Sequence, residues 1–449
     1  MPDSIPKPPP PRQPQLWPDA EAQSPVWRPI HYLGSKLRLV HAIRSRLADL
    51  GPSGGAVCDL FAGSGTVSLA LSRERMVVAA DIQEYSRVLC SAILQPGDLS
   101  GDAVNGFRES VSAKHRDLAP RIAPLIEYEE EVLARSSHDP SPLCDLIEHG
   151  SLLSGRNAGD RLCIALAETA ARIEQHPARF LATRYFGGAY FSFRQALYLD
   201  CVLDSIDQLS PADQDTYLAA LLSTASTLVN SVGKQFAQPL RPRKADGSVK
   251  RHLIGQMGRD RGLSPEQVFA GWLAKYGELP RGGQHKAVRA DYREALSDLG
   301  GVSVIYADPP YTRDHYSRFY HVLETLCLRD RPTVSTTTIR RKGELSRGLY
   351  RADRHQSPFC IKSQAPKAFT DLFRGSRKIG VPLLLSYSPY LRNGHPRLMT
   401  VEAIAASARE HYRAVEVVPV SVVTHSKLNR TDLHLDALAN AEVFITCRP

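Results

Sequence analysis

The tetrad Asp308-Pro309-Pro310-Tyr311 follows the apolar run 302–306 and carries three groups that can hold a planar amine. The Asp308 carboxylate and the Pro309 carbonyl can each accept a hydrogen bond, and the ring of Tyr311 offers a flat surface for stacking. The two prolines fix φ and remove two N–H donors, so the turn is rigid. An aromatic amine bonded to two acceptors is a better nucleophile, because its lone pair is held on nitrogen. The alternative is a proline turn that only ends a strand.

A second motif is a glycine turn with Phe61, Gly63 and Gly65, between a predicted strand at 56–60 and a predicted helix that begins near Thr66. Glycines let a ligand approach the backbone closely, and a helix N-terminus offers free N–H groups. A dinucleotide-binding turn requires a further glycine three residues on, where this chain has Ser68. Ordinary strand-to-helix geometry gives the same pattern, so the turn alone does not decide between a ligand site and a simple connection.

Asp81 ends the next predicted strand, at 76–80. A carboxylate at the end of this strand can accept hydrogen bonds from ribose hydroxyls. The alternative role is a helix N-cap. Because Asp81 occurs together with the glycine turn, we favour ribose binding.

These motifs must be brought together by a sheet. The order strand, turn, helix, strand over 56–81 is the opening of a parallel, doubly wound α/β sheet, which binds ligands at the carboxyl ends of its strands. Further strands are predicted at 302–306, 382–387, 414–423 and 442–447, with a helix at 401–412. The last two strands have no clear crossover helix between them, which predicts an antiparallel pair at a sheet edge.

The chain divides into four predicted parts. Residues 1–29 contain ten prolines and are expected to form a disordered tail. Residues 30–95 and 286–449 would form the two halves of the sheet domain. Residues 96–285 lose the sheet rhythm and favour a mainly helical insertion, in which the aromatic segment 185–193 is expected to pack in the core.

Composition narrows the class of protein. The net charge of +9 and the pI of about 9.1 favour a polyanionic partner such as nucleic acid. The eight cysteines form no C-x-x-C pair, so we expect no metal site and a reducing compartment, the cytoplasm. No apolar run is long enough to span a membrane, and the polar N-terminus is unlike a signal peptide.

Nearly everything after residue 30 resembles the Dam-like (alpha-type) S-adenosylmethionine-dependent DNA adenine-N6 methyltransferases. The resemblance rests on short motifs that occur in the family's own order. They are the N-terminal cofactor motif with Tyr32, Gly34 and Lys36, the glycine loop with Asp59, Phe61, Gly63 and Gly65, the ribose ligand Asp81, the segment with Asp291 and Tyr292 that contacts the cofactor adenine, and the catalytic tetrad Asp308, Pro309, Pro310 and Tyr311.

The resemblance implies a Rossmann-like class I methyltransferase sheet with an inserted, mainly helical target-recognition domain. It further implies S-adenosylmethionine as cofactor, double-stranded DNA as partner and a flipped-out adenine as target, without a metal. We expect a monomer or weak dimer. The segments 316–325 and 425–430 are similar to a restriction-modification-like branch of the family, which leaves open a restriction endonuclease or defence-system partner.

Basic and polar side chains outside these motifs are candidates for DNA contact, since Lys and Arg bind phosphates. Two clusters lie at 241–251 and 340–354. His321 and Glu324 either form a helix packing face or are functional, in which case we expect them to contact a phosphate or shape the base pocket. The predicted DNA-binding set is Arg241, Arg243, Lys244, Arg340, Arg341, Lys342, His425, Asn429 and Arg430.

Four other functions compete with adenine methylation of DNA. Methylation of cytosine N4 uses the same geometry on another exocyclic amine. Methylation of RNA adenine or protein glutamine is disfavoured, because those enzymes usually begin the tetrad with Asn, where this chain has Asp308. A catalytically idle DNA-binding scaffold is disfavoured by the intact tetrad and the complete set of cofactor motifs.

Overall fold

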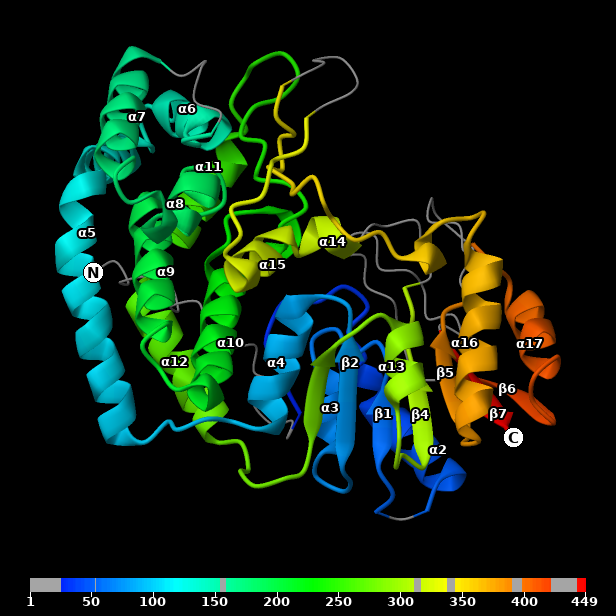
Figure 1. Ribbon diagram of the computed structural model, residues 1–449. Coiled ribbons are helices and arrows are strands. Elements are labelled where there is room, and N and C mark those ends of the chain that lie inside the picture. Colours follow the sequence, from blue (N-terminus) through cyan, green and yellow to red (C-terminus); the bar gives the residue numbers. More distant parts are fainter. Residues whose placement is uncertain are drawn as a thin grey trace, which may run out of the picture.

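The computed structural model describes residues 26–52, 54–153, 159–310, 316–336, 344–389, 398–420 and 442–449. Within these ranges the chain forms a seven-stranded β-sheet beside a lobe of helices (Figure 1). The strands come from both ends of the chain: β1 (Val57–Asp59), β2 (Val77–Asp81), β3 (Lys286–Arg289), β4 (Val304–Ala307), β5 (Leu383–Tyr387), β6 (Ala414–Val420) and β7 (Glu442–Arg448). No helix in this described part is long and apolar enough to cross a membrane.

The strand order is β3-β2-β1-β4-β5-β7-β6. The first five strands are parallel, and β7 lies antiparallel between β5 and β6. The predicted α/β sheet and its antiparallel edge are therefore confirmed. From β1 the strand order continues outward to β2, and from β4 it continues outward to β5 on the other side. The carboxyl ends of the neighbouring strands β1 and β4 therefore flank the crevice where such sheets bind ligands.

Helices cover both faces of the sheet, and the alternation of side chains along each strand decides which helices a residue contacts. In β4, Val304 and Tyr306 belong to one hydrophobic core, and Ile305 and Ala307 belong to the other. The helices of the first face are α2 (Val40–Leu50), α3 (Thr66–Leu71) and α4 (Glu84–Leu94), and those of the second are α13 (Tyr292–Asp298), α16 (Ala365–Ile379) and α17 (Val401–Arg409).

The helical lobe is formed by the chain between α4 and β3, and α14 (Tyr316–Phe319) and α15 (His321–Leu328) follow β4 next to it. The helix α15 contacts both α4 and α10, so lobe and sheet share one hydrophobic core. Tyr190, Phe191 and Phe193 are fully buried, as predicted for the aromatic segment. The lobe contains α5 (Gly101–Arg135), α6 (Ser141–His149), α7 (Asp160–Ile173), α8 (Leu181–Phe186), α9 (Phe193–Ile206), α10 (Pro211–Leu228), α11 (Arg251–Arg261) and α12 (Pro265–Gly277).

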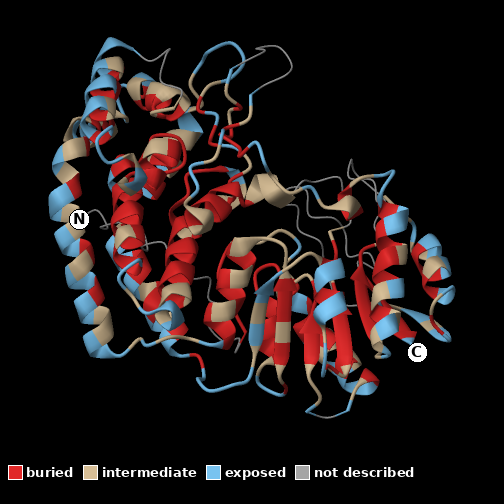
Figure 2. Cartoon of the chain, viewed as in Figure 1, coloured by how far each residue is buried: buried red, intermediate tan, exposed pale blue. Residues whose placement is uncertain are grey.

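Two features of the fold are absent from the sequence prediction. The strand β3 is missing there because it lies at the sheet edge with Lys286, Val288 and Arg289 exposed, so it lacks an apolar pattern (Figure 2).

Packing also begins before residue 30. The Trp27 ring is 6% exposed and lies 5.9 Å from the ring of Trp272, between centroids. Residues 26–29 are therefore part of the packed chain, whereas 1–25 lie outside the described residues.

Candidate active site

One pocket brings together motifs that are far apart in the sequence. It lies at the carboxyl ends of β1, β2 and β4 and contains about 940 Å³ of space, part of it open to solvent. A smaller pocket beside it shares Tyr32, Lys36 and Asp308 and adds Asp59. The predicted site residues that line the larger pocket are Tyr32, Gly34, Lys36, Phe61, Asp81, Asp291, Tyr292, Asp308, Pro309 and Pro310.

The glycine loop lies against the N-terminal motif. Gly63 has φ +55°, and a Cβ placed on it would lie 2.6 Å from the Tyr32 hydroxyl oxygen. The Tyr32 ring in turn stacks on Tyr320, with ring centroids 4.9 Å apart. Gly65, with φ +75°, precedes the first residue of α3. A side chain at position 63 would push Tyr32 out of the pocket wall, so this contact requires glycine.

Two carboxylates, the half-buried Asp81 and the buried Asp59, hold the glycine loop and the helix α3 that follows it. Asp81 accepts hydrogen bonds from the Gly63 N–H at 3.0 Å and the Gln83 N–H at 2.9 Å. Asp59 accepts from the Ser68 hydroxyl at 2.6 Å. Burial raises the pKa of both carboxyls, that of Asp59 to about 6. Each oxygen of Asp81 retains a further lone pair, so this carboxylate can still accept from a ligand hydroxyl in the pocket.

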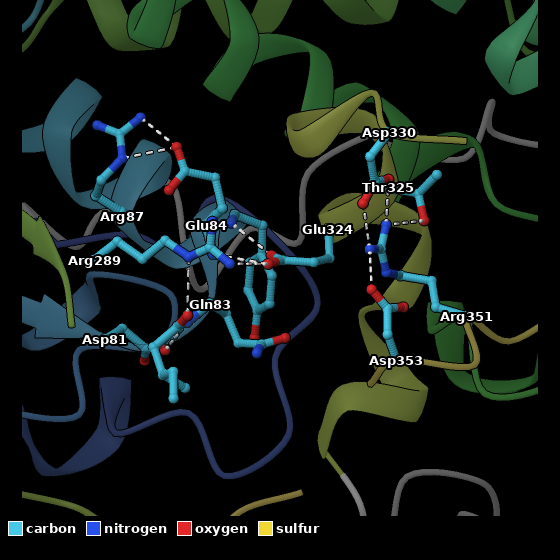
Figure 3. Close-up of polar contacts among 12 residues, drawn as sticks. Asp81, Gln83, Glu84, Arg87, Arg289, Glu324, Thr325, Asp330, Arg351 and Asp353 are labelled. Carbon is cyan, nitrogen blue, oxygen red and sulfur yellow. Dashed lines mark hydrogen bonds and ion pairs between the residues drawn. The ribbon is translucent and has the colours of Figure 1, made fainter. Parts of the chain in front are cut away.

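The segment after Asp81 is held by Glu324 of α15, for which the sequence left a packing face and a functional role open (Figure 3). The Glu324 carboxylate accepts from the N–H groups of Glu84 and Tyr85, the first two residues of α4, at 3.1 and 3.0 Å. Arg289 of β3 lies 3.7 Å from the same carboxylate and donates to the Ile82 carbonyl. A carboxylate at a helix N-terminus satisfies free N–H groups and the positive end of the helix dipole. Glu324 therefore fixes the pocket wall of residues 81–85.

A charge cluster lies at the turn after β4, where Asp308 meets two buried charged residues. Lys36 Nζ lies 3.0 Å from Asp308 Oδ1 and 3.0 Å from Glu442 Oε1, and the Ser386 hydroxyl donates to Glu442 at 2.8 Å. Burial raises the pKa of Asp308 to about 7. Lys36 opposes the rise and the Glu442 carboxylate adds to it. Lys36, predicted as a cofactor residue, lines the pocket, and its ammonium group forms an ion pair with Asp308 of the tetrad. Glu442 was not predicted.

Aromatic rings form the wall of the pocket opposite the charge cluster. The Phe61 ring lies 5.8 Å from Tyr292 and 5.5 Å from Phe359, between centroids. Asp291 accepts from the Arg293 N–H at 3.0 Å and is the N-cap of α13. Its carboxylate thus has a structural role in addition to lining the pocket.

The predicted DNA-binding residues have different surroundings. Arg241 and Lys244 are exposed. Arg243 donates to Asp145 at 2.8 Å and Glu148 at 2.6 Å, so two carboxylates neutralise it. Tyr311 of the tetrad and the predicted DNA contacts Arg340, Arg341, Lys342, His425, Asn429 and Arg430 lie outside the described residues.

His321 is a core residue. It is 1% exposed, its Nε2 lies 3.1 Å from the Phe236 carbonyl, and burial lowers its pKa to about 3. The imidazole is therefore neutral at physiological pH. Of the two interpretations that the sequence left open for His321, the structure favours the packing face.

The sheet with its pocket at the β1/β4 crevice is that of a Rossmann-like methyltransferase, and comparison with known proteins finds similar enzymes. Residues 32–117 match the D12 class N6 adenine-specific DNA methyltransferases. The chain is 23% identical to the type II methyltransferase M.NlaIII of Neisseria lactamica over 77% of this chain and 80% of that protein. It is 39% identical to the modification methylase LlaI of Lactococcus lactis subsp. lactis over 80% of this chain, but spans only 46% of LlaI. The protein is thus an enzyme of the DNA adenine-N6 methyltransferase class.

Proposed function

We propose that the protein transfers a methyl group from S-adenosylmethionine to the N6 amine of a flipped-out adenine, at a specific sequence in double-stranded DNA. One observation carries this proposal: acceptors for an amine, Asp308 and the Pro309 carbonyl, share a pocket with Asp81, an acceptor for ribose hydroxyls. The match of residues 32–117 to adenine-specific enzymes supports adenine as the base.

The residues of the pocket fit the cofactor. Asp81 would bind the ribose, and the rings of Phe61 and Tyr292 would contact the adenine on the aromatic wall. The absence of a Cβ at Gly63 keeps Tyr32 in the wall of the pocket. When bound, S-adenosylmethionine supplies an electrophilic methyl group on its sulfonium.

The tetrad would act on the target amine. Flipping costs a few kcal/mol, part of which is offset by hydrogen bonds from the amine to Asp308 and Pro309 and by stacking on Tyr311. These acceptors orient the nitrogen lone pair toward the methyl donor, and the methylated amine then loses a proton to solvent. The ionised form of Asp308 is the better acceptor, and Lys36 helps to keep it ionised.

Recognition of the DNA sequence falls to the helical insertion of residues 96–285 and to the basic segments beside it. The modification methylases among the relatives support a restriction-modification role, in which a separate nuclease cleaves unmodified sites. Expression of the protein should then protect cellular DNA from one such nuclease. Sequencing of modified bases in that DNA would identify the site.

The test of the catalytic role is Asp308→Asn. We expect methyl transfer from labelled cofactor to DNA to fall by about 10²-fold or more, because the amine loses a charged acceptor. Cofactor affinity by calorimetry should stay within about twofold. The control Asp298→Asn, at an exposed position in α13, should leave activity unchanged. Full activity of Asp308→Asn, or label on cytosine N4 after nucleoside analysis, would overturn the proposal.

A further inference from the structure

Two arginines share one tyrosine ring at the edge of the pocket. The guanidinium carbons of Arg318 and Arg354 each lie 4.9 Å from the centre of the Tyr350 ring. Tyr350 is 6% exposed, and Arg318 Nη2 lies 3.3 Å from its hydroxyl oxygen. Both arginine side chains are partly exposed. The buried ring therefore holds two cationic groups in fixed positions with access to solvent.

Neither guanidinium has a carboxylate partner within the described part of the chain, and this sets the pair apart from neighbouring arginines. Arg351, in the same segment, is bound by Asp330 at 2.6 Å and Asp353 at 2.9 Å. Burial and the nearby charge of Arg318 lower the pKa of Arg354, opposed by Tyr350 and Asp353. Asp353, the acid that acts on the pKa of Arg354, is thus already bound to Arg351. Two like charges held together without an anion form a site that an anion would stabilise.

Both arginines are adjacent in the chain to residues that line the pocket. Arg318 directly follows Tyr316 and Ser317, and Arg354 directly precedes His355; these three neighbours line the pocket. Consecutive Cα atoms are about 3.8 Å apart, so each arginine begins within one residue of the pocket wall. A base that enters a pocket leaves its own sugar-phosphate backbone at the pocket mouth.

We propose that Arg318 and Arg354 form a binding site for a DNA backbone phosphate beside the flipped nucleotide. The inference rests on the proposed function, because it assumes that the pocket receives a base from DNA. Two guanidinium groups can donate several hydrogen bonds to the non-bridging oxygens of one phosphodiester. Contacts of this kind fix the position of the nucleic acid and do not read its sequence. The site therefore acts equally on every DNA sequence that the enzyme binds.

The experiment measures the salt dependence of DNA binding for the double variant Arg318→Gln/Arg354→Gln, by fluorescence anisotropy with a labelled duplex between about 50 and about 200 mM salt. Loss of this one phosphate contact should reduce the slope of log K against log salt by about 0.9, which corresponds to roughly eightfold weaker binding at about 0.1 M salt. Cofactor affinity should not change. Arg318→Lys and Arg354→Lys should keep most of the slope, because a lysine still neutralises a phosphate.

The matched control is Arg409→Gln. Arg409 is an exposed arginine in the last turn of α17. Within the described residues it has no acidic partner, and it does not line the pocket. Its slope should equal that of the unchanged protein. An unchanged slope in the double glutamine variant at 318 and 354, or an equal loss in Arg409→Gln, would overturn the phosphate site. Failure of the unchanged protein to bind or methylate DNA would instead overturn the proposed function.

Discussion

Replacement of Glu442 by Gln isolates the electrostatic control of Asp308. Glu442 is 2% exposed and shares the Lys36 ammonium with Asp308, while Ser386 donates to the same Glu442 oxygen. Glutamine has nearly the same shape and can still accept from Ser386. The substitution therefore removes one negative charge from a cluster of two carboxylates and one ammonium, and changes little else.

The size of the effect follows from two distances. Because Lys36 Nζ is 3.0 Å from each carboxylate oxygen, these oxygens of Asp308 and Glu442 are separated by at most about 6 Å. Two unit charges at that separation repel by about 3 kcal/mol at an effective dielectric constant of about 20, which equals about two pKa units. Removal of this repulsion should lower the pKa of Asp308 from about 7 by one to two units.

The assay is methyl transfer in a single turnover from about pH 5 to about pH 9, which avoids limitation by product release. Asp308 is a strong acceptor only when ionised, so activity should fall as the pH drops through its pKa. Glu442→Gln should move this acidic limb to lower pH. Lys36→Gln removes the opposing positive charge and should move the limb to higher pH. If both variants moved the limb in the same direction, or neither moved it, the cluster would not control Asp308.

Two further substitutions test the pocket wall. Asp81→Asn should weaken cofactor binding about 10- to 100-fold by calorimetry, because one charged acceptor is lost; unchanged affinity would exclude ribose binding by Asp81. Glu324→Gln should destabilise the N-terminus of α4 by about 1–2 kcal/mol, because the side-chain amide presents only one acceptor oxygen. Faster hydrogen exchange at the Glu84 and Tyr85 amides would show this, and unaltered exchange would contradict it.

The sequence predicts those parts of the site in which a short motif adjoins a buried strand. Asp81 ends β2 and Asp308 follows β4, and both strands are recognisable as apolar runs. The parallel sheet then determines that their carboxyl ends meet, because neighbouring strands align in this direction. The motifs on β1, β2 and β4 were therefore expected to line one crevice, and the structure places them in one pocket.

The parts that the sequence misses depend on long-range pairing. Glu442 reaches Lys36 only because β7 inserts between β5 and β6, with Val443 opposite Tyr387. Nothing in the local sequence around Glu442 distinguishes it from a polar residue at the start of a strand. The strand β3 is missed for a different reason: its side chains are exposed, and strand prediction relies on buried apolar residues.

A long insertion between the two halves of a site would leave their relative position loosely defined unless contacts outside the insertion fix it. Here such contacts connect the halves directly. Lys36 of the N-terminal half is paired with Asp308 of the C-terminal half, and Glu324 and Arg289 of the C-terminal half hold residues 82–85. Methyl transfer requires donor and acceptor to be placed within a fraction of an ångström, which these contacts provide on the rigid sheet. If the insertion reads DNA as proposed, it can vary in length and sequence without displacing these contacts.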